Sequence, residues 1–187
     1  MTTSELPVFH TERLTLRALT CDDTDALMRR YSEVENSEYM MFGPLSDRES
    51  AAKIVEFAES LVSEEEGVLW GVIEKNTGQL IGVLDYQHES AYSEVLYRSE
   101  IGYDLSPAHW GKGLMVEAIR PTLRYVFENS EVRRIHTGVD VNNYRSIRVL
   151  MKLGFQFEGI LREYGCRRGK FYDEAMFSLL KRESSAK

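Results

Sequence analysis

A helix-forming segment between two strand-forming segments constrains the fold of this chain more than any other feature. The apolar spacing from Gly113 to Asn129 predicts a helix, with a kink or local break expected at Pro121. A strand pattern at 94–105 precedes this helix, and another at 134–139 follows it. Strands joined through a helix lie parallel through a right-handed crossover, so the middle of the sheet is expected to be partly parallel.

The flanking segments extend this unit to a mixed α/β single domain of order β-α-α-β-β-β-α-β-α-β-β. The further strands are expected at 13–17, 68–74, 79–86, 155–161 and 171–180. One further helix is expected after Thr20, and a second begins at the capping-box pattern of Ser46 and Glu49 and ends at Gly67. A third is expected over 143–153 and ends at Gly154. A loop at 165–169 is expected to join the last two strands. We expect one domain over residues 1–187, with a core of 8–181 and a disordered tail at 182–187.

Composition excludes several function classes. With 187 residues and 43% apolar content, the chain is long enough for one buried core. A net charge of −7 disfavours nucleic acid as a partner, and no apolar run reaches membrane-spanning length. The N-terminus lacks a secretory pattern, and the two cysteines, Cys21 and Cys166, form no CxxC motif. Four histidines in no metal-binding spacing predict no metal site, and we expect a cytoplasmic protein.

The segment from Ile101 to Met115 carries the strongest functional signal. A strand ends, a loop with Gly111 and Gly113 follows, and a helix begins. Unpaired N–H groups at a helix start favour an anion, and glycines allow a ligand to approach the backbone, so a diphosphate is the natural guest. The dinucleotide fingerprint fails because Val116 stands at its third glycine, and a Walker A loop is absent. Taken alone, this segment fits a turn with packing glycines equally well.

Four separated windows resemble the GNAT acetyltransferase superfamily, and most closely its branch of bacterial ribosomal-protein (alanine/serine) N-terminal acetyltransferases. The first window is Thr11-Glu12-Arg13-Leu14-Thr15-Leu16-Arg17, which is similar to T-E-R-L-x-L-R. The second is Ile101-Gly102-Tyr103 with Trp110-Gly111-Lys112-Gly113 and Glu117-Ala118, which is similar to an I-G-Y strand and a G-K-G loop. The third is Asn143 to Ser146 with Lys152-Leu153-Gly154-Phe155, similar to N-x-x-S and K-L-G-F, and the fourth is Glu158-Gly159 with Tyr172-Asp173, similar to the closing hairpin. The likeness spans nearly the whole chain, and its spacing makes it specific.

The resemblance implies an acetyl-CoA-dependent transfer to an amine, by direct attack within a ternary complex. The cofactor-binding residues that it implies are Asp104, Leu105, Trp110, Gly111, Lys112, Gly113, Leu114, Met115, Asn143 and Ser146. In the family's Gln/Arg-x-x-Gly-x-Gly/Ala loop, Trp110 occupies the first position here and Met115 the last, small one. Backbone N–H groups near Asp104 or Leu105 are the implied oxyanion donors, and Asn143 is implied to bond the pantetheine arm, with an N-cap as the alternative.

Candidate catalytic residues follow from the same likeness. Leu150 stands where the wider family places an acidic tyrosine, so Ser146 is the alternative proton donor to the leaving thiol. A structural role for Ser146 would be a hydrogen bond to the carbonyl four residues earlier. The candidate base is Glu100, on the strand that would flank the acetyl group, or Glu163 by analogy within the branch, and a chain of water molecules is a further alternative. Each carboxylate also fits an ordinary surface role.

Acceptor binding is expected between the first two helices, at residues 33–42. Glu35 and Glu38 stand there beside Tyr39 and Phe42, and an acidic, aromatic rim suits a cationic amine. A helix end with core-facing side chains is the other interpretation. The acceptor is a protein or peptide N-terminal α-amine, such as that of a ribosomal protein, or a small amine such as a polyamine or aminoglycoside. A non-catalytic CoA-binding domain is a third hypothesis, and the family likeness makes a homodimer a possible assembly.

Overall fold

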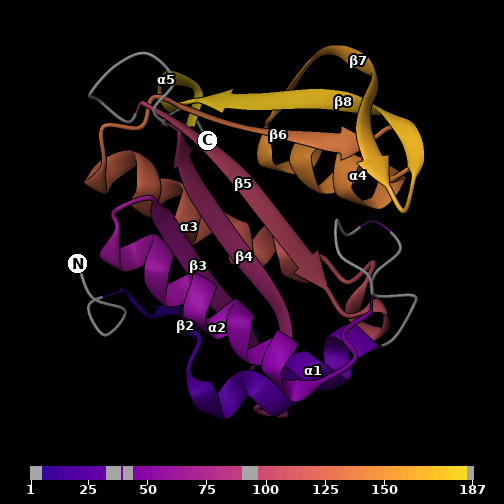
Figure 1. The fold of residues 1–187 in the computed structure, drawn as a ribbon. Helices are drawn as coiled ribbons and strands as arrows, with labels where there is room; N and C mark the ends of the chain where they lie inside the picture. The colour runs from indigo at the N-terminus through magenta and orange to yellow at the C-terminus, as the bar shows by residue number, and fades with distance from the viewer. Residues whose placement is uncertain (1–5, 33–38, 40–43, 90–96, 185–187) are drawn as a thin grey trace.

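One mixed sheet of eight strands organises the chain, in the order β1-β2-β3-β4-β5-β6-β8-β7 (Figure 1). The structure, a computed structural model, describes residues 6–32, 39, 44–89 and 97–184. The strands are β1 (Phe9–His10), β2 (Leu14–Ala18), β3 (Gly67–Glu74), β4 (Leu80–Glu89), β5 (Arg98–Leu105), β6 (Arg134–Asp140), β7 (Gln156–Arg167) and β8 (Lys170–Leu180). The helices are α1 (Thr24–Ser32), α2 (Arg48–Ser63), α3 (Leu114–Asn129), α4 (Tyr144–Leu153) and α5 (Lys181–Ser184).

The predicted mixed α/β order and its parallel pair are confirmed, with β1 and α5 as additions. Strands β5 and β6 pair in parallel, whereas the other described neighbours are antiparallel. This parallel pairing covers only three positions and ends at Glu100 opposite His136. Beyond it the two strands separate, as Figure 1 shows. The backbone of residues 101–105 therefore has no strand partner on the β6 side, which leaves an opening in the middle of the sheet.

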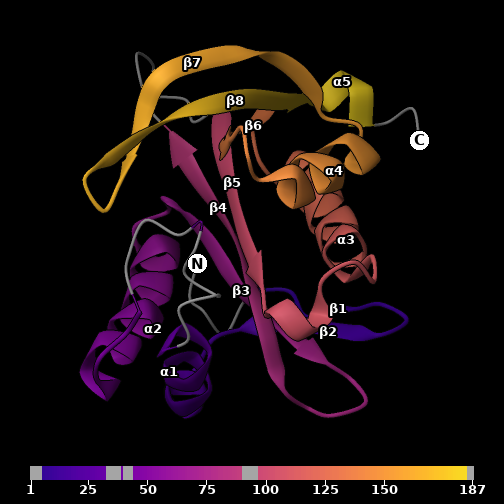
Figure 2. The same ribbon diagram turned by 90° about the vertical axis from the view of Figure 1, so that its right-hand side faces the viewer.

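Helices cover the sheet on both sides. Figure 2 shows α1 and α2 on one side of it, and α3 and α4 on the other. The larger buried cluster contains side chains of α3 and α4 together with Trp70, Tyr86 and Ile101 from the strands. A second cluster contains side chains of α1 and α2 together with Leu69 and Val83. The point at which β5 and β6 stop pairing therefore lies between two differently built sides of the sheet.

Two expected boundaries of α2 are wrong by a few residues. Asp47, rather than Ser46, caps the helix, because its Oδ1 accepts a hydrogen bond from the Ser50 N–H at 2.7 Å. The Ser46 hydroxyl instead donates to Asp47 Oδ2, so Ser46 and Glu49 do not form the expected capping box. The helix ends at Ser63, and Glu65 takes the left-handed turn at φ 59°, whereas Gly67 already begins β3.

Further expectations fail in the second half of the chain. Helix α3 has no local break at Pro121, because only one hydrogen bond is lost there while Ala118, Ile119 and Leu123 anchor the helix in the core; the alternative expectation of a kink stays a prediction. Strands β7 and β8 replace the loop expected at 165–169 and meet at a two-residue turn, where Arg168 and Gly169 have φ of 52° and 75°. The tail expected from residue 182 begins as the short helix α5.

Candidate active site

The glycine loop between β5 and α3 is open to a ligand. Gly111 and Gly113 adopt left-handed φ angles of 76° and 78°, which other L-residues rarely take. A Cβ atom built on Gly111 would meet no heavy atom within 4 Å, and one on Gly113 would meet only a guanidinium nitrogen of Arg13 at 3.9 Å. Among the described residues, the space beside both glycines is therefore left open.

Main-chain N–H groups converge where this loop becomes α3. The helix begins at Leu114 without a side-chain cap, and no group in the described part of the chain accepts from the N–H groups of residues 111–116. Leu114 and Met115 turn their side chains into the core, with 3% and 5% exposure. The bulk of Met115 thus points away from the loop's open side. These donors and the helix dipole fit a diphosphate.

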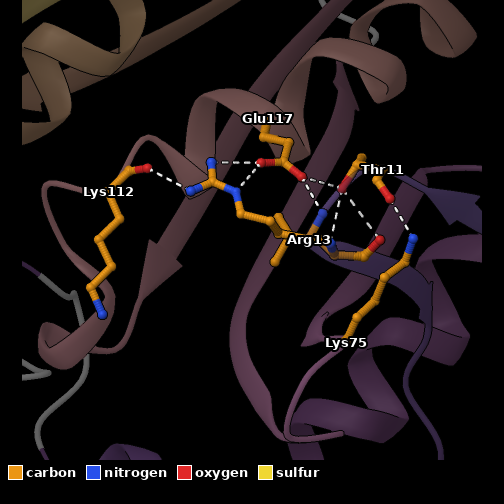
Figure 3. Close-up of polar contacts among 6 residues, drawn as sticks. Thr11, Arg13, Lys75, Lys112 and Glu117 are labelled. Atoms are coloured by element: carbon orange, nitrogen blue, oxygen red, sulfur yellow. Dashed lines mark hydrogen bonds and ion pairs between the residues drawn. The ribbon is translucent and has the colours of Figure 1, made fainter.

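Thr11 and Arg13 of the N-terminal segment bind Glu117 and the Lys112 carbonyl, and this set of contacts, called the clamp below, holds the glycine loop (Figure 3). Glu117, in the first turns of α3, accepts hydrogen bonds from the Thr11 hydroxyl at 2.5 Å and from the Arg13 backbone N–H at 2.8 Å. The Arg13 guanidinium donates to the same carboxylate at 2.7 Å through Nε. Its Nη1 donates to the Lys112 carbonyl at 3.0 Å. Residues about a hundred positions apart thereby hold the loop together.

The clamp also sets the direction of a loop amide. In a trans peptide, the C=O and the following N–H point in opposite directions. Because Arg13 holds the Lys112 carbonyl, the Gly113 N–H is turned away from the clamp. Burial raises the pKa of the Glu117 carboxyl, but the hydrogen bonds from Thr11 and Arg13 outweigh it and lower that pKa. Glu117 is therefore ionised at neutral pH, as the clamp requires.

Removing the clamp is expected to weaken cofactor binding. Arg13→Ala frees the Lys112 carbonyl and leaves Glu117 without its cation, so we expect the Kd for acetyl-CoA in titration calorimetry to rise by about tenfold. The control is Arg134→Ala, which breaks a comparable ion pair with Glu158 on β6 and β7. Equal Kd values in the two variants would show that the clamp does not position the loop.

Two hydroxyl groups meet beside the opening in the sheet. The Tyr103 hydroxyl on β5 lies 2.7 Å from Ser146 Oγ on α4 and donates to the Ser146 carbonyl at 3.3 Å. Ser146 therefore does not bond back to its own helix. Burial raises the pKa of Tyr103, so this phenol keeps its proton at neutral pH. Asn143 caps α4, since its Oδ1 accepts from the Ser146 N–H at 3.1 Å.

Glu100 lies on the other side of β5, among further carboxylates. By strand alternation it shares a face with Gly102, which abuts Asp85, and with Asp104, which contacts α1. Although Glu100 as a residue is exposed, desolvation by the neighbouring strands raises the pKa of its carboxyl. The charges of Glu89, Asp85 and Glu174 raise it further. Such an environment is typical of a general base.

Comparisons with known proteins decide the family. A domain family described as "Acetyltransferase (GNAT) domain" matches residues 13–156. The chain belongs to the GNAT acetyltransferase family. It is 36% identical over 178 residues to "Uncharacterized N-acetyltransferase p20" of Bacillus licheniformis, covering 95% of this chain and 98% of the relative. It is 28% identical over 110 residues to the "[Ribosomal protein uS5]-alanine N-acetyltransferase" of Escherichia coli, covering 59% and 56%.

A solved structure shows the same fold. The microcin C7 self-immunity acetyltransferase MccE, in complex with acetyl-CoA and AMP, superposes with a TM-score of 0.81 at 18% identity, over 90% of this chain and 93% of that one. This protein is accordingly an N-acetyltransferase, and GNAT acetyltransferases use acetyl-CoA. In the described residues no helix is long and apolar enough to cross a membrane. The same residues contain no cluster of three or more His, Cys, Asp or Glu side chains arranged for a metal ion.

The remaining residues that the sequence predicts to bind the cofactor differ in the groups that they leave available to a ligand. The carboxylate of Asp104 accepts from the Tyr31 hydroxyl at 2.5 Å and pairs with Arg30, so only its backbone is left for a ligand. The Leu105 carbonyl accepts from the Trp110 indole N–H at 2.5 Å. Lys112 is exposed, and its ammonium group extends away from the clamp (Figure 3).

The candidate base Glu163 is placed differently from Glu100. It lies on β7, which β6 and β8 separate from β5 in the sheet order. Its backbone is left-handed at φ 51°, in an irregular stretch of the β7–β8 pairing, and its N–H donates to Asp173 Oδ1 at 2.8 Å. The structure thus assigns Glu163 a contact through its backbone.

Of the expected acceptor residues, only Tyr39 is described. The Arg167 guanidinium lies 5.4 Å from the Tyr39 ring centroid, so Tyr39 lies near the end of β7. Glu35, Glu38 and Phe42 lie outside the described residues. Sequence reasoning missed Tyr103, Glu117 and Arg13 as site residues. The I-G-Y, E-A and T-E-R-L windows contained them, but nothing in their spacing shows which partners they meet.

Proposed function

We propose that this enzyme moves the acetyl group of acetyl-CoA directly to a primary amine, through the opening between β5 and β6. The observation that supports this most is the placement of opposite chemical groups on the two sides of β5. The glycine loop, Ser146 and Tyr103 lie on the side of α3 and α4, where Ile101 is buried. Glu100 faces the side of α1, as Asp104 does. An amine and a thioester can therefore meet at the opening from opposite sides.

The residues present fit acetyl-CoA, because open glycines and unpaired N–H groups stand where a diphosphate is expected. When bound there, acetyl-CoA would supply the activated acetyl thioester. The N–H groups of residues 111–115 would hold the diphosphate, and the Asn143 side-chain amide would bond the pantetheine arm. Backbone N–H groups near Asp104 and Leu105, unpaired on the β6 side, would stabilise the oxyanion.

Two proton movements complete the transfer. Glu100 takes a proton from the incoming ammonium group at its carboxylate, which generates the neutral nucleophile. The Ser146 hydroxyl gives a proton to the leaving sulfur, and it is reprotonated through the Tyr103 hydroxyl, 2.7 Å away, by the second proton that the amine nitrogen loses as the amide forms. A free thiol has a pKa near ~8.5, so this leaving group needs only modest help from an acid.

The hydroxyl pair can be tested directly. Ser146→Ala is expected to lower kcat by about tenfold with an unchanged Kd for acetyl-CoA, and Tyr103→Phe to lower it less. Because the two groups act as a unit, the double variant should resemble Ser146→Ala alone in steady-state assays. The control is Tyr86→Phe, which removes another buried hydroxyl, 3.0 Å from that of Thr122. Wild-type kcat in Ser146→Ala would remove this residue from the mechanism.

The acceptor proposed first is the α-amine of a protein N-terminus, such as that of a ribosomal protein. Its support is the likeness to an Escherichia coli enzyme that bears this activity in its name. The carboxylates of Asp85, Glu89, Glu100 and Glu174 favour a cationic acceptor, and they also favour the alternative, a polyamine or aminoglycoside. A cytoplasmic location and a homodimer remain predictions of the sequence.

Acceptor profiling separates these two proposals. The protein is incubated with acetyl-CoA and a panel of peptides, polyamines and aminoglycosides, and the products are read by mass spectrometry. Acetylation of peptide α-amines supports the first proposal, whereas acetylation confined to small amines supports the second. Uptake of acetyl-CoA without release of CoA for any amine would contradict both.

A further inference from the structure

An arginine from α4 lies on the first residue of the glycine loop. The Arg145 guanidinium carbon is 4.5 Å from the centroid of the Trp110 ring, within the range of a cation–π contact. Arg145 is exposed, and no carboxylate in the described part of the chain lies within ion-pair distance of it. Arg13, the other guanidinium at the loop, is occupied by Glu117.

Trp110 forms a fixed platform for this arginine. Its indole N–H donates to the Leu105 carbonyl at 2.5 Å, which ties the ring to the end of β5. The indole has one N–H donor and no other. Trp110 therefore has no free side-chain donor for a phosphate, although it stands at the first position of the loop that is expected to bind the diphosphate.

Stacking leaves the arginine's own donors available. A guanidinium contacts an aromatic ring through its flat face, while its five N–H groups project from the edge in a fork that matches phosphate oxygens. The platform also reduces the side-chain entropy that an exposed arginine loses when it binds. The contact thus combines an arginine without an ion-pair partner among the described residues with a position on the first residue of the glycine loop.

We propose that Arg145, held on Trp110, is a phosphate-binding residue for the diphosphate of the acyl-CoA substrate. Arg145 and Trp110 together would supply the side-chain hydrogen bond to the diphosphate that a single polar side chain at position 110 would supply alone. This inference rests on the proposed function, because it takes the glycine loop as the site of the diphosphate. It also explains how the loop functions with an indole at its first position.

Binding measurements on three variants test the proposal. In titration calorimetry, Arg145→Ala is expected to raise the Kd for acetyl-CoA by about tenfold to a hundredfold, as for a lost hydrogen bond to a charged group. Arg145→Lys should recover only part of the affinity, because an ammonium neither stacks as a plane nor binds two oxygens as a fork. Arg148→Ala is the control, because Arg148 is an equally exposed arginine one turn along α4. It should leave the Kd unchanged.

Fragments of the substrate locate the contact. Arg145→Ala should weaken 3′-dephospho-CoA as much as acetyl-CoA, and should leave S-acetylpantetheine, which has no diphosphate, unaffected. A loss confined to ligands with the 3′-phosphate would overturn the assignment to the diphosphate. Trp110→Leu, which removes the platform and keeps the cation, should weaken acetyl-CoA in the same direction. This second variant tests the stack separately from the charge.

The outcomes also separate this inference from the proposed function. If the wild-type protein binds acetyl-CoA and Arg145→Ala binds it equally well, the role of Arg145 is wrong and the proposed function stands. If the wild-type protein takes up no acetyl-CoA, both are wrong. Salt gives an independent readout, since the Kd of Arg145→Ala should respond less steeply to ionic strength than that of the wild type.

Discussion

Glu100→Gln is expected to lower kcat by about 10²–10⁴-fold and to leave the Kd for acetyl-CoA unchanged, because the variant loses the proposed general base. The amide keeps the size and polarity of the carboxyl and cannot take a proton. The loop and its clamp lie on the other side of β5 and are not touched by this change. Stopped-flow or steady-state assays of CoA release, with acetyl-CoA binding measured in parallel, separate the two effects.

The pH profile adds a readout that a structural role of Glu100 would not give. A general base works in its deprotonated form, so activity is lost as the pH falls through the pKa of Glu100. Because desolvation and the charges of Glu89, Asp85 and Glu174 raise that pKa, the loss begins at a higher pH than for an ordinary carboxyl. The acid limb of kcat/KM should therefore disappear in Glu100→Gln.

Glu163→Gln is the comparison variant. Glu163 lies on β7, away from β5 in the sheet order, and its backbone rather than its carboxylate makes the described hydrogen bond. This variant should keep most of the activity and the acid limb of the wild type. A large loss in Glu163→Gln, with Glu100→Gln near the wild type, would assign the base to Glu163 and contradict the present account.

Gly113→Val is expected to weaken acetyl-CoA binding by about a hundredfold or more while the protein stays folded, through backbone strain of ~1–3 kcal/mol and a side chain on the loop. Gly113 has a φ of 78°, which a β-branched residue adopts only with strain. Its substitution also moves the N–H groups that start α3. Titration calorimetry measures the affinity, and circular dichroism checks the fold.

Gly78→Val is the matched control for backbone strain. Gly78 lies in the turn between β3 and β4 at a φ of 69°, and a Cβ atom there would meet nothing within 4 Å. The two variants should lose similar Tm, because each places valine in a left-handed conformation. Only Gly113→Val should lose affinity for acetyl-CoA. Equal affinities would mean that the loop does not bind the cofactor.

Periodicity and capping residues predict much of this fold, because they act within a few residues of one another. The cap of α4 by Asn143 and its end at Gly154, which has a φ of 90°, follow directly from residue types. The end of α2 is less predictable, since Glu65 takes the left-handed position that glycine usually takes. The turn at Arg168 is hidden from sequence for the same reason.

The candidate site can be predicted from the sequence only in part. The glycine loop can be singled out from sequence because its proposed function depends on backbone N–H groups and on the conformational freedom of Gly111 and Gly113. The contacts of Arg13 with Glu117 and of Tyr103 with Ser146 join segments far apart in the chain, so no local spacing indicates them. The direction of Met115, into the core, likewise depends on how α3 packs.

A crystal structure of the protein grown with acetyl-CoA tests the central claim most directly. The account predicts that the diphosphate oxygens lie within hydrogen-bond distance of N–H groups between Gly111 and Met115, with the thioester at the opening between β5 and β6. A nucleotide bound anywhere else on the molecule would contradict the assigned loop and the proton-transfer roles that depend on it.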